Sequence, residues 1–280
     1  MLALLHPVAQ VGAGFSVHPS TAIGLAALGA AYEWRARQGA REARLLGAPV
    51  NELPAARRLL FHGALLVLFL TLNGPVHDLS DEYLFSAHMV QHLILELLVP
   101  PMLLAGTPGW MLRPLLRVRG VGALARWITR PVIAFAVFNV VLAAWHLPPL
   151  YNLALAVHAV HILQHLMFLA ASVLMWWPLM GSLPELPRLS YPGQMLYCFL
   201  MTLPMSVVAV YITMADRVLY PLYAIAPRVL GISPLEDQRY GGLIMWVPGG
   251  LFFYGVMTVV FVLWTRRGGE DTAGAAQVAG

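Results

Sequence analysis

The chain has 280 residues, of which 59% are hydrophobic and only 11% are charged. This composition excludes a series of soluble domains and indicates one polytopic membrane domain. The net charge of +4 comes from arginine alone, since the chain has no lysine, and in a membrane protein such an excess reports orientation and not nucleic-acid binding. The single cysteine, Cys198, excludes a disulfide framework.

Seven hydrophobic segments follow one another along the chain, and each is near or above the ~18–20 residues that cross a hydrocarbon core of ~30 Å. We expect an all-α membrane protein, a bundle of seven transmembrane helices. Residues 1–16 would precede the bundle, residues 17–265 would form it, and residues 266–280 would follow as a tail. The segments are 17–34, 59–76, 83–105, 131–149, 156–180, 194–214 and 240–264.

Arginine is distributed unequally between alternate loops. Fourteen of the 17 arginines lie in the loops after the first, third and fifth segments and in the C-terminal tail. The other loops hold only Arg217, Arg228 and Arg239. By the positive-inside rule, this asymmetry predicts that the N-terminus lies outside and the C-terminus is cytoplasmic.

Two stripes of ionisable side chains lie within these apolar segments. His88, His92 and Glu96 recur at every fourth residue, so on a helix they are displaced by only about 40° per step and share one face. Ionisable side chains in a membrane span are costly, and by default they face a bundle interior and carry function. The second stripe, in the row VHAVHILQHLMF, consists of His158, His161 and His165.

The predicted orientation gathers histidines in the outer half of the bilayer. At 1.5 Å per residue, His88 and His161 lie roughly 8 Å below the outer interface. His92 and His165 lie roughly 13 Å below it by the same rise. His146 ends the fourth segment at the outer surface, and His158 lies near the mouth of the bundle.

The spacing HxxxH, present in HMVQH and HILQH, puts two imidazoles on one helix face, one turn apart, which suits a metal ion. Imidazole binds copper, zinc, iron and nickel, while thioether sulfur, as in Met89, favours Cu(I). A lone buried histidine would be satisfied by a carbonyl or a glutamine. Five histidines at matching depths favour a metal site instead.

Other ionisable residues receive weaker predictions. Glu96 is either a carboxylate that supports the site and relays protons, or a protonated group bonded to a neighbouring helix. His6, His18, His62 and His77 are predicted to be interfacial and not functional.

Five motifs follow one another between about Phe61 and Trp264: AHMVQHLIL, WHLPPLYNLAL, HILQHLMFLAASVLMWWP, DRVLYPLY and LEDQRYGGLIMWVPGG. The ordered set resembles the seven-span CtaG family of cytochrome c oxidase assembly factors. The resemblance implies a non-enzymatic protein of the bacterial plasma (inner) membrane that helps place copper at the Cu-B centre of oxidase subunit I. The positions that match the family are His88, His92, His146, His161 and His165, with Asp237 and Gln238 in the last motif.

This resemblance gives a hypothesis for copper handling. Copper, with Cu(I) favoured, would be received near His146, His158 and Asp237 and then pass laterally to subunit I. The partners would be subunit I or other oxidase assembly proteins, together with membrane lipid, and no nucleic acid. The oligomeric state is left open. The imidazoles that would hold the ion are those of His88, His92, His161 and His165.

Three alternatives stay open. The first is a haem-binding electron carrier with His92 and His165 as axial ligands of one haem. The second is a metal or proton transporter that uses Glu96 near the midplane, although the chain shows no internal repeat of the kind many transporters have. The third is a membrane-embedded metal hydrolase, for which only Glu96 and the pair Glu236–Asp237 offer a general base.

Overall fold

The computed structural model describes residues 15–47, 53–186 and 188–279, and every regular element in these ranges is a helix, as the sequence predicts. The elements, in chain order, are α1 (Pro19–Leu45), α2 (Ala55–Thr71), α3 (Gly74–Glu82), α4 (Phe85–Leu93), the π-helix η1 (Ile94–Leu98), α5 (Val99–Gly106), α6 (Gly109–Leu116), α7 (Val121–Ile128), α8 (Pro131–His146), α9 (Pro148–Ala156), α10 (His158–Met180), α11 (Tyr191–Thr213), α12 (Pro221–Ile225) and α13 (Pro234–Ala279).

Four helical stretches are long and apolar enough to cross a membrane: Phe85–Gly106, His158–Met180, Tyr191–Thr213 and Pro234–Arg267. Two further pairs of helices meet the same criterion together but are bent, α2 with α3 by 48° and α7 with α8 by 78°. The described residues therefore contain four to six candidate spans. The remaining predicted segment lies in α1, which falls short because its second half is the charged row EWRARQGAREAR.

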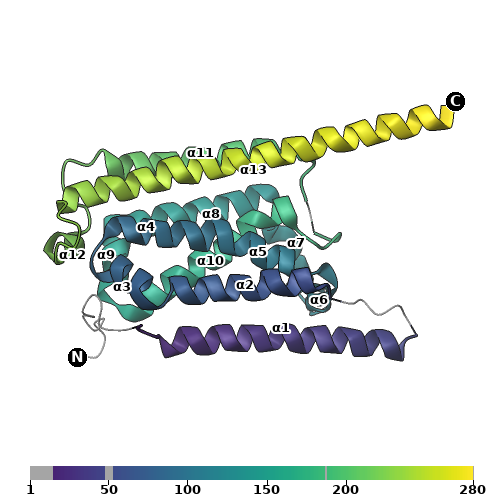
Figure 1. Cartoon of the computed structure of the whole chain (residues 1–280), viewed down its shortest axis with the longest axis horizontal. Helices are drawn as coiled ribbons and strands as arrows, with labels where there is room; N and C mark the ends of the chain where they lie inside the picture. Colours follow the sequence, from purple (N-terminus) through teal and green to yellow (C-terminus); the bar gives the residue numbers. More distant parts are fainter. Residues whose placement is uncertain (1–14, 48–52, 187, 280) are drawn as a thin grey trace.

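The helices form a layered bundle (Figure 1). α1 lies along one side, and α11 and α13 lie along the opposite side, with α2, α4, α8 and α10 between them. We call the end that carries α3, α9 and α12 the histidine end, and the end that carries α6 and α7 the arginine end. The central hydrophobic core joins α4, α8, α10, α11 and α13 and includes the fully buried Phe168 and Met175.

α1 is attached to the bundle near the middle of its length. The Tyr32 hydroxyl donates a hydrogen bond of 2.8 Å to the carbonyl of Gly106, and the Tyr32 ring stacks on Phe61 with centroids 3.8 Å apart. The Arg35 guanidinium lies 5.5 Å from the centre of the Trp110 ring, a cation–π contact. These contacts hold the charged half of α1 against α2, α5 and α6.

A local change of helix type places Glu96 in the interior. Pro100 and Pro101 have no backbone N–H, so the carbonyls of Glu96 and Leu97 lose their α-helical donors. The backbone widens into η1, and the indole N–H of Trp176 donates a bond of 2.9 Å to the Glu96 carbonyl. Single π-turns of this kind are frequent at functional sites.

Two short helices close the histidine end. The chain bends by 48° after Asn73, where Gly74 has φ +65°, and α3 packs against α4. Gly74 is required there because its conformation is left-handed and because a Cβ would lie 2.4 Å from the Phe15 ring. At the end of α8, extended backbone at Leu147 before Pro148 turns the chain into α9, which packs across α8 and α10.

Candidate metal centre

Three imidazoles from two helices converge at the histidine end. His88 on α4 and His161 and His165 on α10 each offer a ring nitrogen, and these three atoms all lie within 4.8 Å of one another. The Nε2 atoms of His161 and His165 are 3.1 Å apart. Metal–imidazole bonds are about 2.0–2.1 Å long, so one ion between these nitrogens can reach all three after small side-chain adjustments. We call His88, His161 and His165 the triad.

A carboxylate that the sequence analysis missed lies directly beside the triad. Asp81, at the end of α3, is only 5% exposed. Its oxygens lie 3.1 Å from Nδ1 of His161, 3.6 Å from Nδ1 of His88 and 3.3 Å from Nε2 of His77. This arrangement leaves the Nε2 atoms of His88 and His161 for a ligand, as in carboxylate–histidine–metal sites.

His77 is also part of the cluster, whereas the sequence predicted an interfacial residue. It is buried, and its Nδ1 lies 3.1 Å from Nε2 of Gln91. Gln91 in turn donates to the carbonyl of Thr71 at 2.8 Å, so its amide also donates toward His77. His77 is thereby held between Gln91 and Asp81. The signal in the sequence was the i, i+4 pair His77–Asp81, which looked like part of a short loop.

His92 and His146 extend the cluster further into the bundle. The His92 ring centroid lies 4.3 Å from that of His88, 5.8 Å from that of His165 and 5.8 Å from that of His146. Within the described residues, both ring nitrogens of His92 and Nε2 of His146 and of His88 have no hydrogen-bond partner. Buried polar groups without partners are uncommon, and a bound ion or water is one explanation for them.

His146 lies deeper than the sequence indicated. It is 2% exposed and not at a surface, because α9 folds back over the end of α8. Its Nδ1 donates a hydrogen bond of 2.7 Å to the carbonyl of Leu142, and the Tyr220 hydroxyl donates to the His146 carbonyl at 2.8 Å. His146 therefore belongs with His92 in the interior.

Glu96 lies one helical turn beyond His92 and is 4% exposed. Its Oε1 has no hydrogen-bond partner among the described residues, and the same holds for both amide atoms of Gln164 on α10. The structure thus places a buried carboxylate on the inner side of the cluster, which leaves both sequence interpretations of Glu96 open.

Two predicted accessory residues have clear packing roles. The carboxylate of Asp237, fully buried at the start of α13, accepts hydrogen bonds from the backbone amides of Phe85 at 2.7 Å and Ser86 at 3.2 Å, and from the Ser86 hydroxyl. It therefore caps the first turn of α4. Met89 is 1% exposed in the core, and a Cβ on Gly241 of α13 would lie 3.2 Å from its Cγ. Their predicted accessory or entry roles for copper stay predictions.

The remaining histidines that the structure describes lie in two regions of the bundle. His62 lies away from the cluster, 3.1 Å from the Glu33 carboxylate, and His6 lies outside the described residues. His18, just before α1, and His158, at the start of α10, have ring centroids 5.8 Å apart. His18 is also 4.6 Å from His77 by centroids, so the sequence prediction of an interfacial His18 missed its contact with the cluster.

A cavity of about 410 Å³ opens beside the triad, between α1, α2 and α10. About half of its lining residues are aliphatic, including Leu25, Leu72 and Leu169. The polar exceptions are concentrated at the histidine end. They are His18, Ser20, Thr21, His77, His158, His161 and His165.

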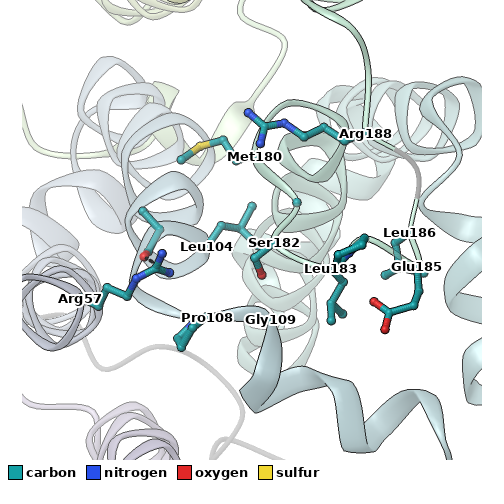
Figure 2. Close-up of a pocket in the computed structure, with 13 residues that line it drawn as sticks. Arg57, Leu104, Pro108, Gly109, Met180, Ser182, Leu183, Glu185, Leu186 and Arg188 are labelled. Carbon is teal, nitrogen blue, oxygen red and sulfur yellow. Dashed lines mark hydrogen bonds between the residues drawn. The ribbon is translucent and has the colours of Figure 1, made fainter. Parts of the chain in front are cut away.

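A second hollow, of about 1010 Å³, lies at the arginine end and has no histidine in its lining (Figure 2). Arg57 and Arg188 approach it from different segments. Beside it, the Arg113 guanidinium lies 2.8 Å from the Glu185 carboxylate. A hydrogen bond from its own backbone amide and this ion pair hold the pKa of the Glu185 carboxyl below its usual range. The hollow lined by Arg57 and Arg188 is thus separate from the cavity lined by the histidines.

The chain is similar to a known protein family over most of its length. The chain matches the profile of the cytochrome c oxidase caa3 assembly factors, Caa3_CtaG, over residues 30–267. The chain belongs to this family. The match confirms the resemblance found in the sequence. It contains the triad, Asp81, His92 and His146, whereas His18 lies outside the matched residues.

The chain is also similar to three mycobacterial proteins of uncharacterised function. The relatives from Mycobacterium bovis and Mycobacterium tuberculosis are each 25% identical over 233 residues, and the relative from Mycobacterium leprae is 22% identical. Each comparison covers 78% of this chain and 35% of the relative, so the chain spans about a third of the length of these curated relatives. No solved structure matches the chain.

Proposed function

We propose that this protein is a multi-pass assembly factor of the bacterial plasma (inner) membrane. It holds copper, as Cu(I), for delivery to the Cu-B centre of cytochrome c oxidase subunit I. Family membership supports the role in oxidase assembly. The copper assignment depends on one observation, a group of buried and half-buried imidazoles whose nitrogens converge. Both ring nitrogens of His88 and His92 and Nε2 of His146 lack hydrogen-bond partners within the described part of the chain.

The arginine distribution supports an orientation in which the histidine end is extracytoplasmic. Arginines of α6 and α7, such as Arg113 and Arg126, lie at the opposite end of the bundle. An extracytoplasmic N-terminus and a cytoplasmic tail require an odd number of spans, so the proposal includes α1 as the seventh. Its 27 residues are about 40 Å long at 1.5 Å per residue, which is enough to cross.

Charge balance supports a monovalent ion at the triad. An uncompensated charge is costly in a low-dielectric interior, and neutral imidazoles supply no compensation. The single carboxylate of Asp81 matches the single charge of Cu(I). A divalent ion would leave an excess positive charge unless Glu96 also ionised. Imidazole nitrogens are suitable ligands for copper.

Delivery follows from the shape of the site. Two members of the triad, His161 and His165, line the cavity between α1, α2 and α10, and the proposal places the approach of a membrane partner there. Subunit I, or another oxidase assembly protein, would accept the ion there. Copper is the cargo in this proposal, and the protein performs no chemical conversion.

The competing haem and hydrolase functions fit the geometry less well. The His92 ring is packed between His88, at 4.3 Å by centroids, and Phe168, at 4.5 Å, which leaves no slot for a macrocycle between His92 and His165. For a hydrolase, the Asp237 carboxylate is occupied by the first turn of α4. The Asp81 carboxylate is directed at imidazoles.

Metal analysis of the purified protein tests the proposal. Wild-type protein prepared in detergent without chelator should carry about one copper per chain and show no haem absorption. The His92→Ala variant should lose this copper. His62→Ala is the matched control, because His62 is half exposed and pairs with Glu33 outside the cluster. Equal copper contents in wild type and His92→Ala, or a Soret band with stoichiometric iron, would overturn the proposal.

Asp81→Asn should weaken copper binding about 10- to 100-fold, the range seen when outer-shell partners of metal-binding histidines are removed. The amide keeps the size of the carboxylate but loses its charge and one acceptor, so His161 and His88 are no longer both oriented. Competition with a Cu(I) chelator measures the affinity. Asp216→Asn, on the exposed loop between α11 and α12, serves as the control. An unchanged affinity would remove Asp81 from the site.

A further inference from the structure

The face of α10 that borders the cavity carries a ladder of imidazoles. His158, His161 and His165 are separated by three and four residues, so neighbouring rungs have Cβ atoms about 5–6 Å apart on one helix face. All three line the same cavity. His161 and His165 belong to the triad. His158 lies nearest the histidine end and is not a member of the triad.

His18 faces this outermost rung from a different part of the chain. The two rings are stacked with centroids 5.8 Å apart and an angle of 29° between their planes. His18 also contacts the edge of His77 at 4.6 Å, and His77 is itself fixed by Gln91 and Asp81. We call His18 and His158 the reception pair.

The segment that carries His18 is fastened to the corner between α2 and α3. The backbone amide of His18 donates to Oδ1 of Asn73 at 2.7 Å, and the amide of Gly74 donates to the Ser16 carbonyl at 2.8 Å. The Ser16 hydroxyl donates to the Asp78 carboxylate at 2.7 Å. Only the backbone amide of His18 takes part in these bonds, and the other two are made by Ser16. The imidazole of His18 is left to line the cavity.

One further imidazole, His77, lines the cavity between His18 and the triad, and it is already held by Gln91 and Asp81. The rest of the cavity lining is aliphatic except for Ser20 and Thr21, which are next to His18. His146, the other residue predicted to receive copper, is buried beneath α9. A cation that crosses the aliphatic wall unaided would lose its ligands, which is costly.

We propose that His18 and His158 form a reception site that binds Cu(I) and passes it along the α10 ladder to the triad, an inference that rests on the proposed function. Transfer proceeds by exchange of ligands. A Cu–N bond to His161 forms as the bond to His18 breaks, and a bond to His165 then replaces the bond to His158. The copper stays Cu(I) throughout, no proton leaves a ring, and the ion is never without imidazole ligands.

The rate of loading tests this proposal on the full-length protein in detergent. Apo protein is mixed with Cu(I) in a chelator buffer, and copper transfer is followed over time from the loss of the chelator complex. His18→Ala and His158→Ala should load about tenfold more slowly than wild type yet reach the same final copper content, because the triad is intact. His62→Ala should load at the wild-type rate.

Two outcomes separate this proposal from the proposed function. If His161→Ala and His165→Ala lose copper while His18→Ala and His158→Ala load at the wild-type rate, the triad stands and the reception pair is wrong. If the triad variants retain wild-type copper, the proposed function fails and the ladder fails with it. Melting temperatures of His18→Ala and His158→Ala within the range of the His62→Ala control exclude misfolding as the cause of slow loading.

Discussion

The double variant His161→Ala, His165→Ala is expected to lose essentially all bound copper while the helical bundle stays folded. His161 and His165 supply two of the three converging nitrogens, and their Nε2 atoms lie 3.1 Å apart. Without them, only the imidazole of His88 is left of the triad. His165 is half-buried on the cavity wall, whereas His161 is buried and lies 3.1 Å from Asp81, so a lower melting temperature should accompany the loss of copper. Elemental analysis and circular dichroism of the purified variant measure the two quantities.

The same double variant should fail to mature cytochrome c oxidase in a deletion strain. Complementation of the deletion strain tests this, with oxidase activity and Cu-B occupancy measured in isolated membranes. His62→Ala again provides the matched histidine control. Full oxidase maturation by a variant without copper would show that the chain assists assembly by some route other than copper transfer.

Asp237→Ala is expected to lower the free energy of unfolding by about 3 kcal/mol, because a buried ionic acceptor is removed and two backbone donors lose their partner. Asp237 is fully buried and accepts bonds from the amides of Phe85 and Ser86, so its loss loosens the start of α4 just before His88. Thermal unfolding in detergent measures the effect. Asp237→Asn, which keeps one acceptor oxygen, should lie between wild type and Asp237→Ala.

The neighbouring acid is the control for this prediction. Glu236 is exposed, and its carboxylate only accepts a bond of 2.8 Å from the amide of Ser233, so Glu236→Gln should leave the melting temperature nearly unchanged. An Asp237→Ala variant that melts like wild type but loads copper slowly would contradict the capping role. It would support the sequence prediction that Asp237 helps to receive copper.

Sequence alone predicted an all-helical membrane protein and most of the histidine cluster. Hydropathy over about 20 residues is a local property, so six of the seven predicted segments coincide with candidate spans or bent pairs. Helical periodicity is also local, and it correctly placed His88 with His92 and His161 with His165 on common faces. Depth counted from the same interface along these two parallel segments matched His88 with His161 and His92 with His165, and the ring centroids of these pairs lie 5.7 Å and 5.8 Å apart.

Only the tertiary structure decided which polar groups complete the site. Asp81 and His77 lie on α3, which exists as a separate helix because Gly74 allows the left-handed turn after α2, and the sequence had treated this stretch as a loop. The segment that carries His18 reaches the cluster through a bond from His18 to Asn73, 55 residues away, and a bond from Ser16 to Asp78, 62 residues away. Asp237 caps a helix 151 residues earlier in the chain, and His146 is buried because α9 folds back over it. Such contacts depend on chain reversals and long-range hydrogen bonds, which local periodicity and hydropathy do not encode.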